Sequence, residues 1–300
     1  MSIVVVGSIS FDTIKTPFGQ REMSLGGAAN YFAMSGKFFS KIKMVGVVGD
    51  DFPPHHLAYL HNENVDITGI ERLGGRSFHW QGEYGYDLGD AKTIKTELNV
   101  FEHFSPKLSP DFCEASTVFL ANIDPDLQIH VLNQMQKPRI RALDSMNFWI
   151  KNKNSRLKTA ISMVDILLIN DAEIRSLSGE HNTIKAAKYA IKMGVKIVVI
   201  KRGEFGALLV TADEVAFVPA YPLEDVFDPT GAGDTFAGGF LGYLDGQPKL
   251  DINNLKKALL MGTVMSSFVI EKFSFDRMKE LDQAAIRKRL EHLHCMVNLS

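Results

Sequence analysis

The chain has 300 residues, of which 45% are hydrophobic, and its formal net charge is −2. A chain of this length and composition can bury the core of one large domain, so we expect residues 1–300 to form a single domain, and the balanced charge argues against binding to nucleic acid or an anionic membrane. The two cysteines, Cys113 and Cys295, match no metal-binding spacing, and no apolar stretch approaches transmembrane length, which together predict a reduced, cytoplasmic protein.

Short apolar runs alternate with helical patterns along most of the chain. The first run, 3–6, precedes a helical pattern at 28–39, and the alternation recurs as far as residue 200. Such spacing favours a mostly parallel sheet with helices on both faces, so the sequence predicts a doubly wound α/β fold. The predicted strands are 3–6, 44–48, 118–120, 140–143, 166–169 and 197–200, and the predicted helices are 28–39, 55–62, 126–135, 155–163, 183–193, 235–240, 253–270 and 276–293.

Two polar segments depart from this alternation. Residues 13–25 and 75–104 follow a period of two and are rich in threonine and aromatic residues, which is typical of exposed antiparallel strands. We expect them to pair into one small β-sheet that acts as a lid over a cleft. An aromatic stripe in the second segment could pack on the body of the protein, clasp a second copy in a homodimer through the lid, or stack on a ligand's base. Its members are Phe78, Trp80, Tyr84 and Tyr86.

The run "DPTGAGDTFAGGF" at 228–240 carries the most specific chemical signal. Gly231 and Gly233 let the backbone come close to a ligand, and a helix that begins just after them would offer free amides and its positive dipole end to an anion. Asp234 lies beside those amides. The run therefore predicts a pocket that holds a phosphoryl group, with a carboxylate that accepts a proton from an attacking hydroxyl. A glycine turn capped by acids, without function, is the alternative; a P-loop would require a lysine that is absent here.

This run resembles the C-terminal motif of the ribokinase/PfkB family of sugar and nucleoside kinases. The resemblance extends over nearly the whole chain, because further motifs occur in the family's order. It implies the doubly wound α/β domain with a small β lid. This chain departs from the family pattern in two places. Its glycine pair lies one residue closer to the asparagine, so that Asn30 or Tyr31 could fill the family's asparagine position, and Lys201 stands where the family often has a threonine. The further motifs are "GSISFD" at 7–12, "LGGAAN" at 25–30, "VVGDD" at 47–51, "NDAE" at 170–173 and "KRGEFGALLV" at 201–210.

The resemblance also implies roles for individual residues. Asp234 would be the general base, beside an anion hole formed by Gly231, Ala232 and Gly233. The implied acceptor-binding residues are Asp12, Gly26, Gly27, Asn30 and Asp234. The implied nucleotide-binding residues are Asn170, Lys201, Gly203, Gly206, Thr230, Gly231 and Gly233. The implied metal-binding residues are Glu173 and Asn170 for Mg²⁺, through water, and Asp228 for a candidate monovalent cation such as K⁺.

Some of these residues also have a purely structural interpretation. Asn170 and Glu173 have the spacing of a helix capping box. Asp12 is expected to end a buried strand, where ligands bind in open α/β sheets, but it could be an unrelated turn acid. Lys201 and Arg202 could neutralise nucleotide phosphates or form a plain surface pair.

The sequence thus predicts an ATP-dependent kinase that uses Mg²⁺ to phosphorylate a hydroxyl or hydroxymethyl group of a small sugar or sugar-like molecule. A nucleoside kinase with the same chemistry is the alternative. A catalytically silent sensor of sugars or nucleotides is an alternative of a different class, against which the intact Asp234 argues.

Overall fold

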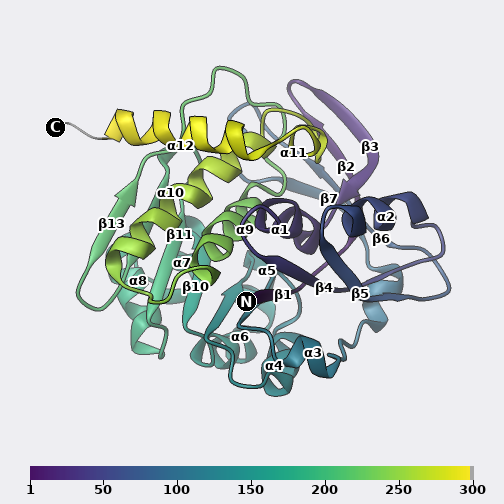
Figure 1. The fold of residues 1–300 in the computed structure, drawn as a ribbon, viewed down its shortest axis with the longest axis horizontal. Helices are drawn as coiled ribbons and strands as arrows, with labels where there is room; N and C mark the ends of the chain where they lie inside the picture. Colours follow the sequence, from purple (N-terminus) through teal and green to yellow (C-terminus); the bar gives the residue numbers. More distant parts are fainter. Residues whose placement is uncertain (298–300) are drawn as a thin grey trace.

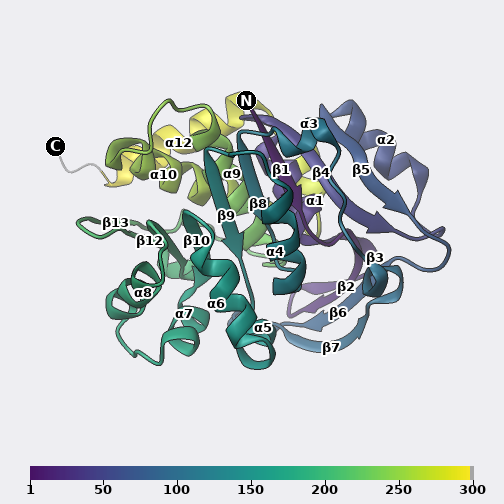
Figure 2. The ribbon, with the colours of Figure 1, turned by 90° about the horizontal axis from the view of Figure 1, so that it is seen from below.

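The computed structural model describes residues 1–297, which form a nine-stranded sheet flanked by helices and a four-stranded sheet at one end of it (Figures 1 and 2). The order of the large sheet is β13-β12-β11-β10-β9-β8-β1-β4-β5, and all pairs from β5 to β11 are parallel. Its strands are β1 (Ser2–Val6), β4 (Lys41–Val48), β5 (Val65–Arg72), β8 (Thr117–Leu120), β9 (Ile140–Asp144), β10 (Ile166–Asn170), β11 (Ile197–Lys201), β12 (Ala207–Val210) and β13 (Val215–Val218).

Helices cover both faces of the large sheet because successive residues of its strands are buried on opposite sides. In β1, Ile3 and Val5 belong to one hydrophobic core with α1, α9 and α10, whereas Val4 and Val6 belong to a second core with α4, α6 and α8. The predicted doubly wound fold is confirmed. The helices are α1 (Ala28–Gly36), α2 (Pro54–Asn62), α3 (Pro110–Cys113), α4 (Pro125–Gln134), α5 (Asn147–Asn152), α6 (Asn154–Ser162), α7 (Asp171–Ser178), α8 (Thr183–Lys192), α9 (Ala232–Asp245), α10 (Ile252–Val269), α11 (Asp276–Lys279) and α12 (Gln283–Val297).

The strand order reverses beside β1. The chain first adds β4 and β5 on one side of β1 and then returns to add β8, β9, β10 and β11 on the other. In open α/β sheets, ligands bind outside the carboxyl ends of the strands at such a reversal, because the connections diverge there and leave a crevice. The fold therefore places a binding site next to the ends of β1 and β8.

The small sheet consists of β2 (Ser10–Thr16), β3 (Gly19–Gly26), β6 (Phe78–Glu83) and β7 (Lys92–Glu97), in the order β3-β2-β6-β7. The predicted second sheet is thus confirmed, with two corrections. β2 and β6 pair in parallel, so antiparallel pairing holds only within each hairpin. Residues 99–103 form a short 3-10 helix, η1 (Asn99–His103), where a continued strand was expected.

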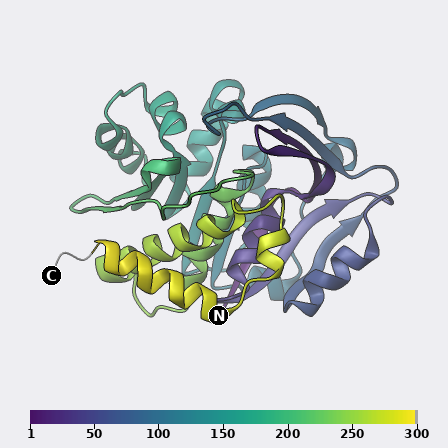
Figure 3. The same cartoon turned by 90° about the horizontal axis from the view of Figure 1, so that it is seen from above.

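Three further boundaries differ from the sequence prediction. Asp12 lies inside β2, not at the end of the first strand. Helix α9 begins at Ala232, because Gly231 takes a left-handed conformation at its N-cap, with φ 74°. The helix expected at 276–293 is divided, since Asp282 accepts a hydrogen bond from the amide of Ala285 and starts α12 anew. Helices α10 and α12 lie side by side over one face (Figure 3). Among residues 1–297, no helix is both long and apolar enough to span a membrane.

Candidate active site

Polar side chains follow the carboxyl ends of four neighbouring strands. Asp144 ends β9, Asn170 ends β10, Lys201 ends β11, and Asn122 comes just after β8. Parallel strands end at the same edge of a sheet, so these residues come together around one open cavity of about 300 Å³. Gly233 and Asp234, in the first turn of α9, line the same cavity. Six of the predicted site residues therefore line one cavity: Asn170, Glu173, Lys201, Gly203, Gly233 and Asp234. Gly206, Asp228, Thr230 and Gly231 are not among its lining residues.

The glycine turn before α9 leaves no room for side chains at its two glycines. A side chain at Gly231 would collide with the ring of Tyr31, since a Cβ there would lie 2.3 Å from Tyr31 Cγ. At Gly233 a Cβ would lie 2.9 Å from Lys201 Nζ, so the ammonium group lies next to the backbone of Gly233. Ala232 differs from the prediction, because its N–H donates to the carbonyl of Pro229 at 3.2 Å. The amides of the two glycines are thus better placed to receive an anion.

Asp234 is a half-buried carboxyl whose pKa is raised to about 7. Burial is the main cause, and the negative charge of Asp144 adds to it, whereas the ammonium of Lys201 acts in the opposite direction. A general base works best when its pKa lies near the working pH. The geometry therefore suits Asp234 to proton transfer; its catalytic role stays a prediction.

Lys201 forms a buried ion pair with Asp144, with 2.5 Å between Nζ and Oδ2. Burial lowers the pKa of Lys201, but the carboxylates of Asp144 and Glu173 outweigh burial and hold it above its usual value. The surface interpretation of Lys201 is therefore wrong. Arg202 instead packs on Phe205, 5.9 Å from the ring centre. Sequence reasoning missed Asp144, although an acid that ends an apolar strand was the available signal.

Asn170 and Glu173 form a complete capping box at the start of α7. Glu173 N donates to Asn170 Oδ1 at 2.7 Å, and Asn170 N donates to Glu173 Oε2 at 2.9 Å. Burial, followed by the charge of Asp144, raises the pKa of Glu173 to about 7, although Lys201 acts to lower it. The structural interpretation is correct, and it leaves one Glu173 oxygen beside the cavity.

The donor set fits Mg²⁺. Glu173 and Asp144 supply hard carboxylate oxygens to the same cavity, and Mg²⁺ usually keeps several waters and needs only one or two protein carboxylates. In the described part of the chain, no group of three His, Cys, Asp or Glu side chains is placed to hold a metal without such help. A nucleotide-bound Mg²⁺ held partly through water is consistent with both observations.

Asp12 and the first glycine pair form a second polar group, under the small sheet. Asp12 is 4% exposed, accepts a hydrogen bond from Ser10 Oγ at 2.8 Å, and has a pKa raised to about 7, mainly by burial. Gly26 leaves room for this carboxylate, since a Cβ would lie 1.9 Å from Oδ2. Gly27, with φ 97°, turns the chain into α1. Of the predicted acceptor-binding residues, Asp12 and Gly26 are thus in contact, and Gly27 follows them directly in the chain.

The Asn30 side chain donates to the carbonyl of Gly26 at 2.7 Å, whereas its Oδ1 has no hydrogen-bonding partner among the described residues. Asn30 is therefore positioned beside the glycine pair with a free acceptor atom. Tyr31 lies instead beneath Gly231, and its ring packs on Phe275 with 4.4 Å between centres. Of the two candidates for the family asparagine position, Asn30 is the one that adjoins the acceptor residues.

Asp228 shapes the turn that precedes Gly231. Its Oδ1 accepts from the amide of Thr230 at 2.9 Å and its Oδ2 from the amide of Ser274 at 3.1 Å. Both oxygens are thus engaged by the backbone, which is a structural use of this carboxylate. A monovalent cation beside it stays a prediction. The other two predicted nucleotide residues, Gly203 and Gly206, form the tight turn after β11 with positive φ angles, and Gly203 lines the cavity.

The aromatic stripe of the second polar segment does not share one face. Strand β6 ends at Glu83 and carries a register shift at Gln81, so the period-two pattern breaks before Tyr84. Phe78 stacks on Phe101, with 5.3 Å between ring centres, whereas Tyr86 is 93% exposed. Tyr84 reaches the body of the same chain, with its hydroxyl 3.0 Å from Thr230 Oγ1.

Trp80 lies on the inner face of the small sheet. It is the β6 partner of Asp12, and paired residues of neighbouring strands project to the same side. On the outer face, Lys15 pairs with Glu83 and His79 pairs with Glu97. Trp80 therefore points inward and Tyr84 contacts the body of the same chain, whereas ion pairs occupy the outer face.

The fold and this cavity define a class of protein, a phosphate-handling α/β enzyme with an acid beside a glycine-rich helix start. Comparison with known proteins gives the family. A model of the pfkB family of carbohydrate kinases matches residues 2–280. The chain belongs to this family and is an ATP-dependent kinase of small molecules.

Individual relatives are nucleoside and sugar kinases. A cytidine kinase of Thermococcus kodakarensis is 31% identical over 281 residues, which cover 91% of this chain and 97% of that protein. A nucleoside kinase of Burkholderia thailandensis, solved in complex with inosine, aligns with a TM-score of 0.81 at 18% identity over 97% of this chain and 98% of its own. A ribokinase of Thermotoga maritima aligns with a TM-score of 0.73 at 20% identity over 97% and 99% of the two chains. The two structures support the fold.

Proposed function

We propose that this protein transfers the γ-phosphoryl group of ATP to the primary hydroxyl of a nucleoside, with Asp234 as the general base. The observation that carries the chemistry is the position of Asp234: a carboxyl with a pKa raised to about 7 stands in the first turn of α9, in a cavity shared with Gly233 and Lys201. A proton acceptor, an anion-binding backbone and a cation are thus within one cavity, as phosphoryl transfer requires.

Each group has one task in this mechanism. Asp234 accepts the proton of the attacking hydroxyl as the oxygen approaches phosphorus. The amides of Gly231 and Gly233 donate hydrogen bonds to the phosphoryl oxygens, on which negative charge is spread in a loose transition state. Lys201 leaves its contact with Asp144 to neutralise the same charge. Bound Mg²⁺ supplies further neutralisation of the nucleotide phosphates.

The acceptor is bound under the small sheet, which we propose acts as a lid. Asp12 accepts hydrogen bonds from the ribose hydroxyls, and Asn30 Oδ1 offers a further acceptor nearby. Trp80, on the same inner face as Asp12, gives the base a surface for stacking, an interaction typically worth about 1–3 kcal/mol per base. The similarity to a cytidine kinase supports a nucleoside on independent grounds.

A free sugar is the second candidate acceptor. Asp12, Gly26 and Asn30 are hydroxyl-binding and space-making groups, and they would serve a sugar without a base equally well. The two candidates differ in their need for Trp80, because only a base gains from a stacking surface.

A phosphorylation screen tests the proposal. The wild-type protein with Mg-ATP is offered cytidine, uridine, adenosine, inosine, ribose, fructose and myo-inositol, and ADP release is measured. We expect the highest kcat/KM for a nucleoside and a loss of about fivefold to a hundredfold in the Trp80→Leu variant, from the stacking energy given above. Higher kcat/KM for a free sugar, unaffected by Trp80→Leu, would replace the nucleoside by a sugar. Tyr86→Leu, at an exposed residue of the following loop, is the matched control.

A further inference from the structure

Two contacts connect the small sheet to the turn that precedes Gly231. Tyr84, just after β6, places its hydroxyl 3.0 Å from Thr230 Oγ1. Ser274 makes the second connection, because its hydroxyl donates to the carbonyl of Leu25 in β3 at 2.6 Å, while its amide donates to Asp228 Oδ2 at 3.1 Å. One contact starts just after β6 and reaches Thr230, and the other starts at Leu25 in β3 and reaches Asp228 through Ser274.

The proposed acceptor residue lies between these contacts. Asp12 is on β2, which pairs with β3 on one side and with β6 on the other. A ligand that contacts Asp12 thus acts on β3, which holds Leu25, and on β6, which Tyr84 follows. Displacement of the small sheet by a bound acceptor would therefore be transmitted to the turn at two points.

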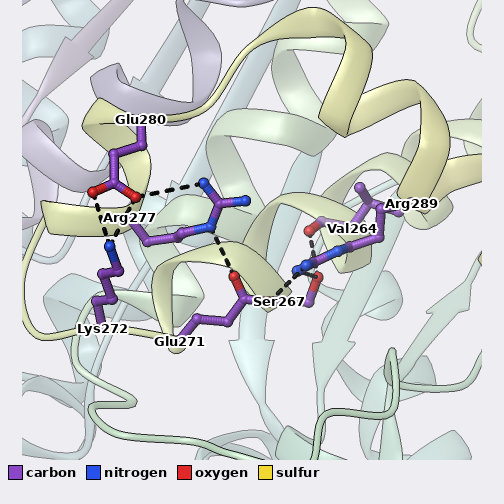
Figure 4. A network of polar contacts seen from close by, with 7 residues as sticks. All are labelled: Val264, Ser267, Glu271, Lys272, Arg277, Glu280 and Arg289. Atoms are coloured by element: carbon purple, nitrogen blue, oxygen red, sulfur yellow. Dashed lines mark hydrogen bonds and ion pairs between the residues drawn. The ribbon is translucent and has the colours of Figure 1, made fainter.

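Ser274 is held in place from the other side as well. It is a buried non-glycine residue with φ 55°, a conformation that persists only where its surroundings fix it. Figure 4 shows an ion-pair network around its segment, in which Glu271 accepts from both Arg277 and Arg289, at 2.9 and 2.6 Å. The neighbouring residue, Phe275, supports Tyr31 beneath Gly231. The network thus joins the residues on either side of Ser274 in the chain to one another and to Arg289 of α12.

We propose that Tyr84 and Ser274 are positioning residues that set the anion-binding turn according to the position of the small sheet. Acceptor binding at Asp12 and phosphate binding at Gly231 then strengthen each other, since a coupling free energy between two sites is reciprocal. The inference rests on the proposed function for the identity of the acceptor. The link between the sheet and the turn requires only the contacts themselves.

Calorimetry with and without an acceptor measures this coupling. The dissociation constant of Mg-ADP is determined alone and with saturating cytidine, in the wild type, in Tyr84→Phe and in Ser274→Ala. Ser274→Gly is a second variant at the serine, because it also lacks the hydroxyl but tolerates the positive φ. The matched controls are Tyr86→Phe, at the exposed tyrosine, and Ser266→Ala, whose hydroxyl donates to the Thr263 carbonyl of its own helix and to no other group within residues 1–297.

We expect cytidine to tighten Mg-ADP binding in the wild type and in both controls. In Tyr84→Phe and Ser274→Ala the tightening should be about two- to tenfold smaller, the effect of one neutral hydrogen bond, while binding of Mg-ADP alone stays within about twofold of the wild type. A full wild-type coupling in both variants would overturn the proposal. An equal loss of Mg-ADP affinity with and without cytidine would also overturn it, since that result indicates a merely structural role.

A second measurement needs no acceptor. Trp80 is on the small sheet, so its fluorescence, obtained by subtracting the signal of a Trp80→Phe variant, reports on the sheet when Mg-ADP binds to the body. We expect a Trp80 response in the wild type that is lost in Tyr84→Phe and Ser274→Ala. If cytidine does not bind but this pattern holds, the proposed acceptor is wrong and the coupling stands. A response that both variants retain would contradict the coupling.

Discussion

The pH dependence of catalysis gives the sharpest test of Asp234. A carboxyl must be ionised to accept a proton, so activity should be present above its pKa and lost below it. With the pKa raised to about 7 by burial and by Asp144, roughly one tenth of the Asp234 carboxyl is ionised at pH 6 and roughly nine tenths at pH 8. We therefore expect kcat/KM to rise about tenfold between these two pH values from this residue alone.

The Asp234→Asn variant should lose about a hundredfold to ten-thousandfold in kcat, the usual range for general-base assistance. The pH profile of its remaining activity should depend on one ionisation fewer than the wild-type profile. Asp12 and Glu173 also have pKa values raised to about 7, so the wild-type profile can be steeper than one proton, and the difference in slope between wild type and variant is the decisive quantity. The affinity for Mg-ATP should change only a few-fold.

The assay is ADP release coupled to a dye-linked reaction, measured from pH 5.5 to 8.5 at saturating Mg²⁺. Asp171→Asn is the control, because this half-exposed acid stands in the first turn of another helix, α7. A variant at Asp234 with most of the wild-type kcat would refute the reasoning, and so would a reduced rate whose pH profile is parallel to that of the wild type.

Four further expectations follow from the same structure. Asp12→Asn should raise the melting temperature at pH 8 but not at pH 4. The folded pKa of the Asp12 carboxyl is raised from 3.8 to about 7, so its protonated form stabilises the fold at low pH, and this contribution of up to about 4 kcal/mol is lost as the pH rises to 7. An equal shift in melting temperature at both pH values would contradict this. Glu173→Gln should raise the Mg²⁺ requirement without lowering the melting temperature, since glutamine preserves the capping box; a sharp fall in stability with unchanged metal dependence would indicate that Glu173 is only a helix cap. Lys201→Met should raise the KM for ATP about tenfold or more, because the ammonium no longer neutralises the phosphates. It should also lower stability, because Asp144 is left buried without its partner. Unchanged ATP kinetics would exclude contact between Lys201 and the phosphates. Sedimentation should show no dimer formed through the small sheet, whose outer face carries ion pairs; a dimer dissociated by Lys15→Glu would contradict that.

Much of the fold could be predicted because its signals are local. The strand at 166–169 is a continuous apolar run, and its alternate residues enter the two cores on opposite faces of the sheet. The glycine turn before Asp234 could be recognised for the same reason, since backbone freedom and charge occur within a few residues.

The missed features depend on contacts between distant residues. Asp144 ends a weak apolar run, and its partner Lys201 is 57 positions further on, so neither residue alone signals the pair. The parallel pairing of β2 with β6 joins segments that lie far apart in the sequence. The sequence groups Tyr84 with Phe78, Trp80 and Tyr86 in one stripe, because the shift at Gln81 and Gly82, which ends the period-two pattern, leaves no clear trace in the sequence.

The central claim is that Asp234 directs the γ-phosphoryl group of ATP to a nucleoside hydroxyl. The most direct test incubates the wild type and Asp234→Asn with cytidine, Mg²⁺ and ATP whose γ-phosphate carries oxygen-18. The labelled phosphate is followed by phosphorus NMR. We predict that the wild type forms cytidine 5′-phosphate in an amount equal to the ADP released, and that the variant forms almost none while it still binds Mg-ATP. Label released only as inorganic phosphate, or an Asp234→Asn variant that forms the product at the wild-type rate, would contradict the claim.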